Sequence, residues 1–189
     1  VTAAIAQVNN DFRKLGTDIG SINSNFSSLY VDSEIQLVLA KKDPLGKCTN
    51  GIIRHYDANT NWSQSNTAAY AYSGNGTNRW PTNKYLNIYI VKCIESATSP
   101  CPPTGGIVVG YTYLPGTWGT NASQDAIVYR YDFLTGLSAR SLSHEMGHWF
   151  NLTHTVGNTN NPGTVCGDDG VTDTPVTKGY FSTCPGNNA

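Results

Sequence analysis

The stretch HEMGHWFNLTH, residues 144–154, places the strongest constraint on how this chain can fold, because it holds three of the chain's four histidines. On an α-helix, His144 and His148 lie about 40° apart around the axis, so both imidazoles leave the same face. Two imidazoles make an open site, and zinc usually takes a third protein ligand. A continuous helix would carry His154 about 15 Å along the axis from His144. The three side chains can therefore meet one ion only if the helix ends between His148 and His154.

Asn151 stands where such a break calls for a residue in the left-handed backbone conformation. Glycine adopts this conformation most easily, and asparagine is the next best tolerated residue. We therefore expect Asn151 to make the bend, at a strain of about 1 kcal/mol relative to glycine.

Glu145 follows the first histidine and points to the side of the shared face. Its carboxylate can reach a water held by the ion without binding the ion itself. Ordinary structural histidines are the alternative, but three of the four histidines fall on this spacing, and only His55 lies elsewhere, in a predicted strand. No glutamate follows the motif. An aspartate as the third ligand stays open through three residues: Asp168, Asp169 and Asp173.

The rest of the chain predicts an amphipathic helix followed by strands and a last helix. Residues 2–15 place Ile5, Val8, Phe12 and Leu15 on one stripe of a helix that ends at Gly16. The last helix is expected to start near residue 135 or 138 and to run to 150, mostly buried against a sheet. Five runs rich in Val, Ile and Tyr predict strands at 34–40, 51–56, 85–93, 106–116 and 126–133.

This order predicts an α+β (α/β-like) fold, in which a twisted five-stranded sheet is backed by two helices. A chain of 189 residues is long enough for one domain with a sizeable core. We expect residues 1–154 to form an upper lobe that ends in the histidine helix, and residues 155–189 to begin an irregular lower lobe. The tail has too little apolar content for its own core, so disulfides, a metal or both must stabilise it.

Composition limits the partners and the compartment. Only 13% of the residues are charged and the net charge is −1, so we expect no nucleic-acid partner. No run of 18 apolar residues occurs, so we expect no membrane partner either. Five cysteines in a chain with few charges favour an oxidising, extracellular setting. Cys93 and Cys101 could form a disulfide, with Cys48 as an equal candidate partner for either.

The motif HEMGHWFNLTH resembles the long zinc signature of the metzincin metallopeptidases, from which it departs at Asn151. Its flanks, RSLSHEMGHWFNLTHTVGN followed by CGDDGVTDTP (166–175) and Cys184, look like the pappalysin family, in particular its cytophagalysin-like secreted bacterial members. YTYLPG (111–116) and AIVYRYD are similar to the strands that lead to the active-site helix of that family. The resemblance covers roughly residues 85–189 and implies a metzincin-type catalytic domain.

The resemblance implies a secreted zinc-dependent endopeptidase that hydrolyses peptide bonds of a protein or peptide substrate with a zinc-bound water. In it, His144, His148 and His154 bind one zinc ion, and Glu145 is the general base and acid. The resemblance also implies a structural calcium in the segment 167–175, at Asp169, Thr174 and Asp173. Oxygen-rich loops suit this hard cation, and a solvated acidic turn is the alternative interpretation.

The segment GIVVGYTYLP, residues 106–115, is a candidate sheet edge above the cleft. An extended peptide can add to such an edge as an antiparallel strand through backbone hydrogen bonds. We expect four residues to bind substrate there: Gly110, Tyr111, Thr112 and Tyr113. A closed inner strand is the alternative.

Metzincins also have a downstream turn with a methionine beneath the zinc, whereas Met146, the only methionine of this chain, lies inside the histidine helix. We therefore expect the lower lobe to be incomplete. The C-terminal remainder of the same polypeptide, as a separate chain, would then be a partner. The alternative function is a non-catalytic, zinc-stabilised binding module or adhesin. Replacement of Glu145 would indicate such a module, but Glu145 is present.

Overall fold

The computed structural model describes residues 1–56, 61–63, 79–95, 108–117, 124–136, 140–157 and 166–179. The chain divides into two compact units, Val1–Phe150 and Asn151–Ala189. The sequence places the boundary between lobes a few residues later, after residue 154, and this assignment of lobes stays a prediction.

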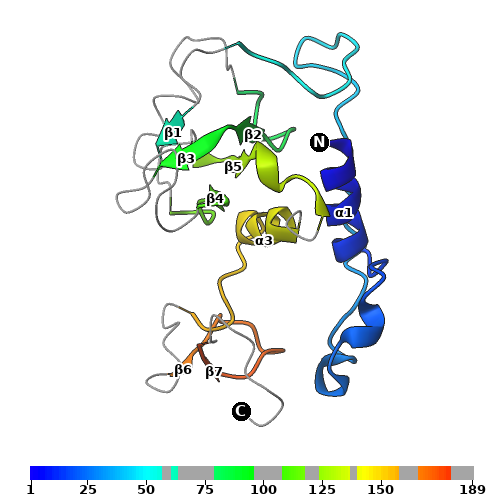
Figure 1. The fold of residues 1–189 in the computed structure, drawn as a ribbon, viewed down its shortest axis with the longest axis vertical. Helices are drawn as coiled ribbons and strands as arrows, with labels where there is room; N and C mark the ends of the chain where they lie inside the picture. The colour runs from blue at the N-terminus through cyan, green and yellow to red at the C-terminus, as the bar shows by residue number, and fades with distance from the viewer. Residues whose placement is uncertain are drawn as a thin grey trace. The chain divides into compact units, whose positions relative to one another are not determined.

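The first unit contains a three-stranded sheet with the strand order β2-β5-β4 (Figure 1). The central strand β5 runs parallel to β2, with Ile127 opposite Ile88, and antiparallel to β4, with Tyr129 opposite Gly110. Two further strands, β1 and β3, form a separate parallel ladder. The strand bounds are β1 Asn61–Ser63, β2 Ile88–Val91, β3 Cys93–Glu95, β4 Gly110–Thr112 and β5 Ile127–Arg130.

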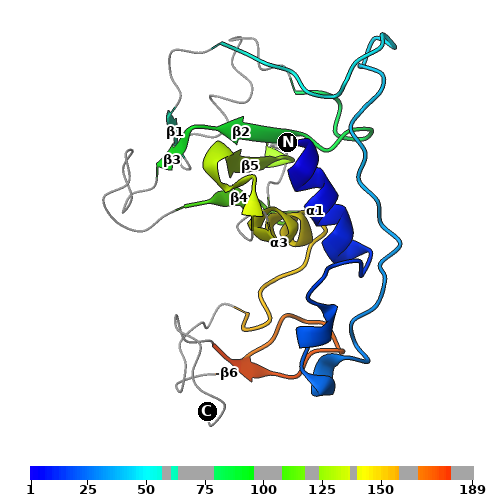
Figure 2. The same cartoon turned by 45° about the vertical axis from the view of Figure 1, so that its right-hand side comes forward.

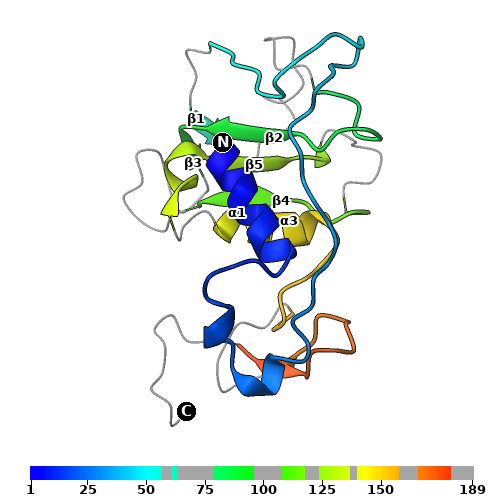
Figure 3. The same ribbon diagram turned by 90° about the vertical axis from the view of Figure 1, so that its right-hand side faces the viewer.

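Two helices pack beside this sheet, α1 (Thr2–Phe12) and α3 (Arg140–Trp149). Figure 3 shows α1 running across the strands, and Figure 2 shows α3 next to α1 on the β4 side of the sheet. The described residues of the first unit also contain three short 3-10 helices: Ile19–Ser21, Ser24–Phe26 and Tyr131–Phe133.

The main core lies between the sheet and the two helices. Successive side chains of a strand point to opposite faces, so Ile127 and Tyr129 share the face of β5 that meets the helices. They pack with four helical residues: Ala4, Val8, Leu142 and Met146. All six are almost completely buried. The core therefore holds α3 against β5 and α1.

A second, smaller core covers the other face of the sheet. Val128 points to this side and packs with Trp62, Ile94 and Tyr111. The indole Nε1 of Trp62 donates a hydrogen bond to the hydroxyl of Tyr111 over 2.9 Å. Because both of its faces are covered, β5 is buried along its whole length, as expected for a central strand.

The α+β fold class is confirmed, and the predicted strands 85–93, 106–116 and 126–133 contain β2, β4 and β5. The strands predicted at 34–40 and 51–56 are wrong, because both segments lie outside any ladder. Asn9 explains the first case. Its side-chain amide donates to the Leu37 carbonyl over 2.9 Å and accepts from the Leu37 N–H over 2.8 Å, so a side chain of α1 replaces a strand partner.

The second unit contains one two-stranded antiparallel ladder, β6 (Cys166–Gly167) with β7 (Thr177–Lys178). Val156 is the only buried residue within 151–157 and 166–179. The described part of this unit therefore has little apolar core.

The cysteines narrow the disulfide alternatives. Cys48 and Cys166 carry free, exposed thiols, which excludes Cys48 as the partner of Cys93 or Cys101. Cys93 is disulfide-bonded, and Cys101 and Cys184 lie outside the described residues. None of the helices in the described ranges is long and apolar enough to span a bilayer.

We predict that Leu142→Ala lowers the free energy of unfolding by about 2–5 kcal/mol, because it leaves a cavity between α1, α3 and β5. Leu142 is 1% exposed, whereas Leu45 is 80% exposed. The matched variant Leu45→Ala should change the free energy of unfolding by less than about 0.5 kcal/mol. Urea denaturation followed by circular dichroism measures both. Equal losses in the two variants would contradict this description of the core.

Candidate metal centre

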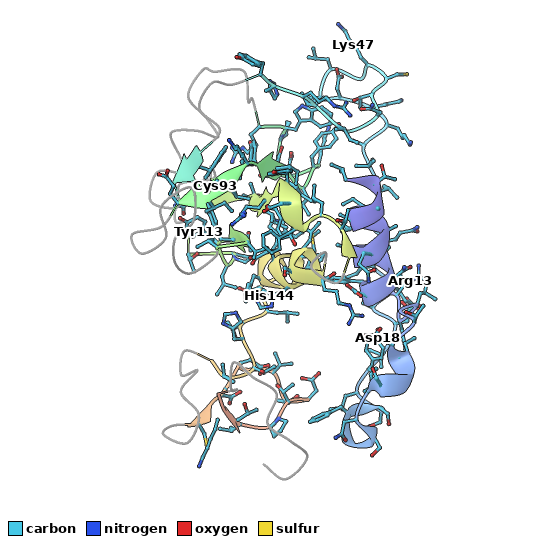
Figure 4. The ribbon with its side chains drawn as sticks, in the orientation of Figure 1. Arg13, Asp18, Lys47, Cys93, Tyr113 and His144 are labelled. Atoms are coloured by element: carbon cyan, nitrogen blue, oxygen red, sulfur yellow. The ribbon has the colours of Figure 1, made fainter. Side chains whose placement is uncertain are left out.

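His144 and His148 lie one helical turn apart on α3 and leave its surface side by side. Their Nε2 atoms are 3.0 Å apart, and their ring centroids are 4.4 Å apart. The opposite face of α3 carries Leu142 and Met146, which are buried in the main core. This division between the two faces leaves the imidazoles away from the core, and Figure 4 shows His144 on α3.

Helix α3 ends at Trp149, and Asn151 turns the backbone with a positive φ of 74°. This is the left-handed conformation that the sequence predicts at Asn151. The residues beyond it are held locally, since the Gly157 N–H donates to the His154 carbonyl over 2.7 Å and the Thr153 hydroxyl donates to the Asp169 carbonyl over 3.0 Å. The chain therefore stops being helical where the third histidine requires it.

One ligand atom from each of His144, His148 and His154 lies within 4.8 Å of the other two. Nitrogen donors about 2.0–2.1 Å from a tetrahedral ion are about 3.4 Å apart, so this donor set fits zinc. No other group of three histidine, cysteine or acidic residues is gathered in this way within the described ranges. The donors are all imidazoles, which suit zinc better than calcium or magnesium.

Glu145 faces the sheet rather than the histidines' side of the helix. The residue is 9% exposed. Burial raises the pKa of its carboxyl to about 7, and a hydrogen bond from the backbone N–H of Thr112 acts in the opposite direction. Glu145 is therefore a buried carboxyl group that directly follows His144 on α3 and lies outside the group of three histidine donors.

Thr112 belongs to β4, which pairs only with β5 among the strands that the structure describes and so lies at the edge of the sheet. Two side chains fix this strand: the Thr112 hydroxyl donates to the Ala126 carbonyl over 2.9 Å, and the ring of Tyr111 is buried beside Trp62. A Cβ atom on Gly110 would lie 2.5 Å from the ring of Tyr129. A glycine is thus needed for β4 to lie close to Tyr129.

The four residues predicted to bind substrate lie along and just after this edge strand, with Tyr113 stacked edge-on against Tyr111 at 6.0 Å between ring centroids. Their position agrees with the expected sheet edge. Their role in binding stays a prediction.

The segment predicted to hold calcium is arranged around Asp169. Its carboxylate accepts hydrogen bonds from the Val171 N–H over 2.9 Å and from the Thr174 hydroxyl over 2.8 and 2.9 Å. These two hydrogen bonds hold the pKa of Asp169 below its ordinary value, and the bond from the backbone N–H of Val171 has the larger effect. In the part of the chain that the structure describes, the acidic side chains, Asp173 included, form no group of three around one point. A calcium ion at Asp169, Thr174 and Asp173 stays a prediction.

Two contacts of the site were not found from the sequence. Thr112 donates to Glu145 from a strand far earlier in the chain, and the Trp149 indole donates to the Asp125 carboxylate over 2.9 Å. Thr112 is expected from the sequence only as a substrate-binding residue, and Asp125 stands in no motif, so no sequence signal marks either contact.

Comparison with known proteins gives three kinds of similarity. A family model described as pregnancy-associated plasma protein-A matches residues 70–188. Extracellular metalloprotease NCU07200 of Neurospora crassa is 30% identical over 139 residues, which are 69% of this chain and 42% of the relative. The chain thus spans less than half of the length of this curated relative.

Among solved structures, mirolysin in complex with compound 9 has a TM-score of 0.82 and 29% identity, covering 98% of this chain and 67% of that chain. Mature mirolysin of Tannerella forsythia in complex with a cleaved peptide has the same TM-score and coverage at 28% identity. A promirolysin variant of Tannerella forsythia matches with a TM-score of 0.81 and 28% identity, over 98% of this chain and 59% of that chain.

We predict that Asn151→Gly does not weaken the affinity for zinc, whereas Asn151→Val does. Valine is strongly disfavoured at positive φ, and a strain of about 1–2 kcal/mol corresponds to a roughly 5- to 30-fold loss of affinity. Competition with a chromophoric chelator measures both affinities. If the valine variant binds zinc as the wild type does, the conformation of residue 151 does not position His154.

Proposed function

Because the chain belongs to the pappalysin family of metzincin metallopeptidases, we propose that it is a secreted zinc-dependent endopeptidase in which Glu145 is the general base. The observation that carries this proposal is the buried Glu145 carboxylate, which accepts a hydrogen bond from the edge strand β4 and directly follows His144, one of three converging imidazoles, on α3. A purely structural zinc site needs no such carboxylate. The family, the named relative and the geometry therefore support the same chemistry.

His144, His148 and His154 would hold the zinc ion, and three protein ligands leave a position open, as catalytic zinc sites do. When bound, zinc would supply Lewis-acid chemistry there. Glu145 accepts a proton from the attacking water and then gives it to the departing amine. The Thr112 N–H keeps one carboxylate oxygen oriented toward β4 during these steps.

The edge strand β4 is the proposed binding site for the peptide substrate. An extended peptide adds to such an edge as an antiparallel strand, and the backbone of residues 110–113 supplies the hydrogen bonds. Support comes from the edge position of β4 and from the anchoring of Tyr111 and Thr112, which keeps the strand in place. Mature mirolysin, which has a similar fold, has been solved in complex with a cleaved peptide.

The proposal also concerns the location of the protein and a second metal ion. The secreted location is supported by the relative named an extracellular metalloprotease. The proposal includes a calcium ion bound around Asp169.

We predict that Glu145→Gln lowers kcat on a generic protein substrate by at least about 10²–10⁴-fold, because the amide cannot accept the proton from water. The zinc content should stay at that of the wild type, since Glu145 is not a ligand. Metal analysis of the purified variant measures this, with Glu34→Gln, an exposed glutamate, as the matched control. Retained turnover in a zinc-loaded Glu145→Gln variant would refute the role of Glu145.

A chelator should abolish hydrolysis, and added zinc should restore it. Zinc should also stabilise the fold, because an ion at 100 times its Kd adds about 2.7 kcal/mol to the free energy of unfolding. Thermal denaturation and peptide cleavage are measured on the same samples. Stabilisation without any hydrolysis would favour the non-catalytic binding module instead.

A further inference from the structure

A polar cluster, which we define as Asp11, Asp18, Arg140 and Ser143, binds the first turn of α3 to α1 and to the segment that follows α1. The Ser143 hydroxyl donates to Oδ2 of Asp11. The Arg140 guanidinium donates to Oδ1 of Asp11 over 3.2 Å and to both oxygens of Asp18 over 2.6 and 2.8 Å. Residues separated by more than 120 positions in the sequence are thus joined directly.

Asp11 is the central member of this cluster. Its two carboxylate oxygens bind two different residues of α3, and Gln7 on its own helix donates to Oδ1 over 2.9 Å. The Asp11 side chain is 15% exposed, whereas that of Asp18 is 49% exposed. Solvent weakens the bonds of Asp18 more than those of Asp11. The guanidinium of Arg140 also lowers the pKa of Asp18 through their hydrogen bond.

The apolar contacts between the two helices do not fix their register by themselves. Ala4 and Val8 of α1 pack in the same core as Leu142 and Met146 of α3, and hydrophobic attraction has no preferred direction. Hydrogen bonds depend on distance and angle. Arg140 and Ser143 lie three residues apart on one face of α3, so bonds from Asp11 to both restrict rotation of the helix and movement along its axis.

The next residues along α3 are those of the metal centre. His144 follows Ser143 directly, and Glu145 comes next, with its bond from the Thr112 N–H. A rotation or a shift of α3 would move the imidazole of His144 and the Glu145 carboxylate together. When a change far from the site misplaces the reacting groups by about 1 Å, the rate falls by up to about 10²-fold.

We infer that Asp11 is a positioning residue of the metal centre: by holding Ser143 and Arg140 together, its carboxylate sets the place of α3, and with it the places of His144 and Glu145. Asp11 acts through the helix and touches neither metal nor substrate. The effect of Asp11 on metal binding rests on the histidine geometry alone. Its effect on hydrolysis also rests on the proposed function.

The test uses cobalt(II) as a probe, because the visible absorption of this ion reports on the geometry of its ligands. Asp11→Ala and Ser143→Ala should each change the spectrum of the cobalt-loaded chain and weaken the affinity for zinc by at least about tenfold, a change within the range of measured coupling energies. The far-ultraviolet circular dichroism should stay that of the wild type. Asp32→Ala is the matched control, because the Asp32 carboxylate binds Arg13 and the backbone N–H of Glu34, each over 2.8 Å, instead of residues of α3.

Two further variants separate positioning from general stability. Asp11→Asn loses the charge that attracts Arg140 but keeps an oxygen that can accept a hydrogen bond from Ser143. Because of this oxygen, Asp11→Asn should retain most of the affinity for zinc that Asp11→Ala loses. The double variant Asp11→Ala with Ser143→Ala should be no worse than Asp11→Ala alone, because Asp11→Ala already removes the bond from Ser143. If Asp11→Ala does not fold, Ser143→Ala and Asp11→Asn still decide the question.

Hydrolysis gives a second measurement. At saturating zinc, kcat of Asp11→Ala should fall at least about tenfold while KM changes less than about twofold, as expected for misplaced catalytic groups. Wild-type cobalt spectra and zinc affinity in folded Asp11 and Ser143 variants would overturn the inference. Absence of hydrolysis in the wild type would refute the proposed function alone, since the spectra and affinities test the positioning without it.

Discussion

The end of helix α3 is the constraint on which the metal centre depends. Two imidazoles separated by one turn of helix face the same point, but a third can join them only when the backbone leaves the helical path. Asn151 provides this change with a φ of 74°, and the hydrogen bonds of Thr153 and Gly157 hold the chain that follows. The fit of the three nitrogens to one zinc ion therefore depends on one left-handed residue, Asn151, which comes just after the end of α3 at Trp149.

The same helix also carries a buried carboxyl group, that of Glu145. Burial is unfavourable for a charged carboxylate, which is why the pKa of Glu145 is raised to about 7. The backbone N–H of Thr112 compensates in part. Through this bond the edge strand β4 and the histidine helix form one assembly in which the proposed base and the proposed substrate strand are neighbours.

The surroundings of α3 determine how accurately this assembly is held. Apolar packing of Leu142 and Met146 holds the helix against β5 and α1, whereas the hydrogen bonds of Asp11 and of Trp149 to Asp125 are directional and select one arrangement. The packing would supply most of the stability and the polar contacts most of the precision.

What the sequence by itself determined is local. The spacing of His144, His148 and His154, the buried face of α3, the bend at Asn151 and the strands β2, β4 and β5 follow from periodicity and from the conformations that single residues allow. The tertiary structure decided the rest. Residues 34–40 have the composition of a strand, yet Asn9 of α1 binds the Leu37 backbone in place of a strand partner. Likewise, Thr112 meets Glu145, and Asp11 meets Ser143 across 132 positions. Such pairs cannot be read from the sequence, because a hydrogen bond depends on the relative placement of whole helices and strands rather than on the residues next to it.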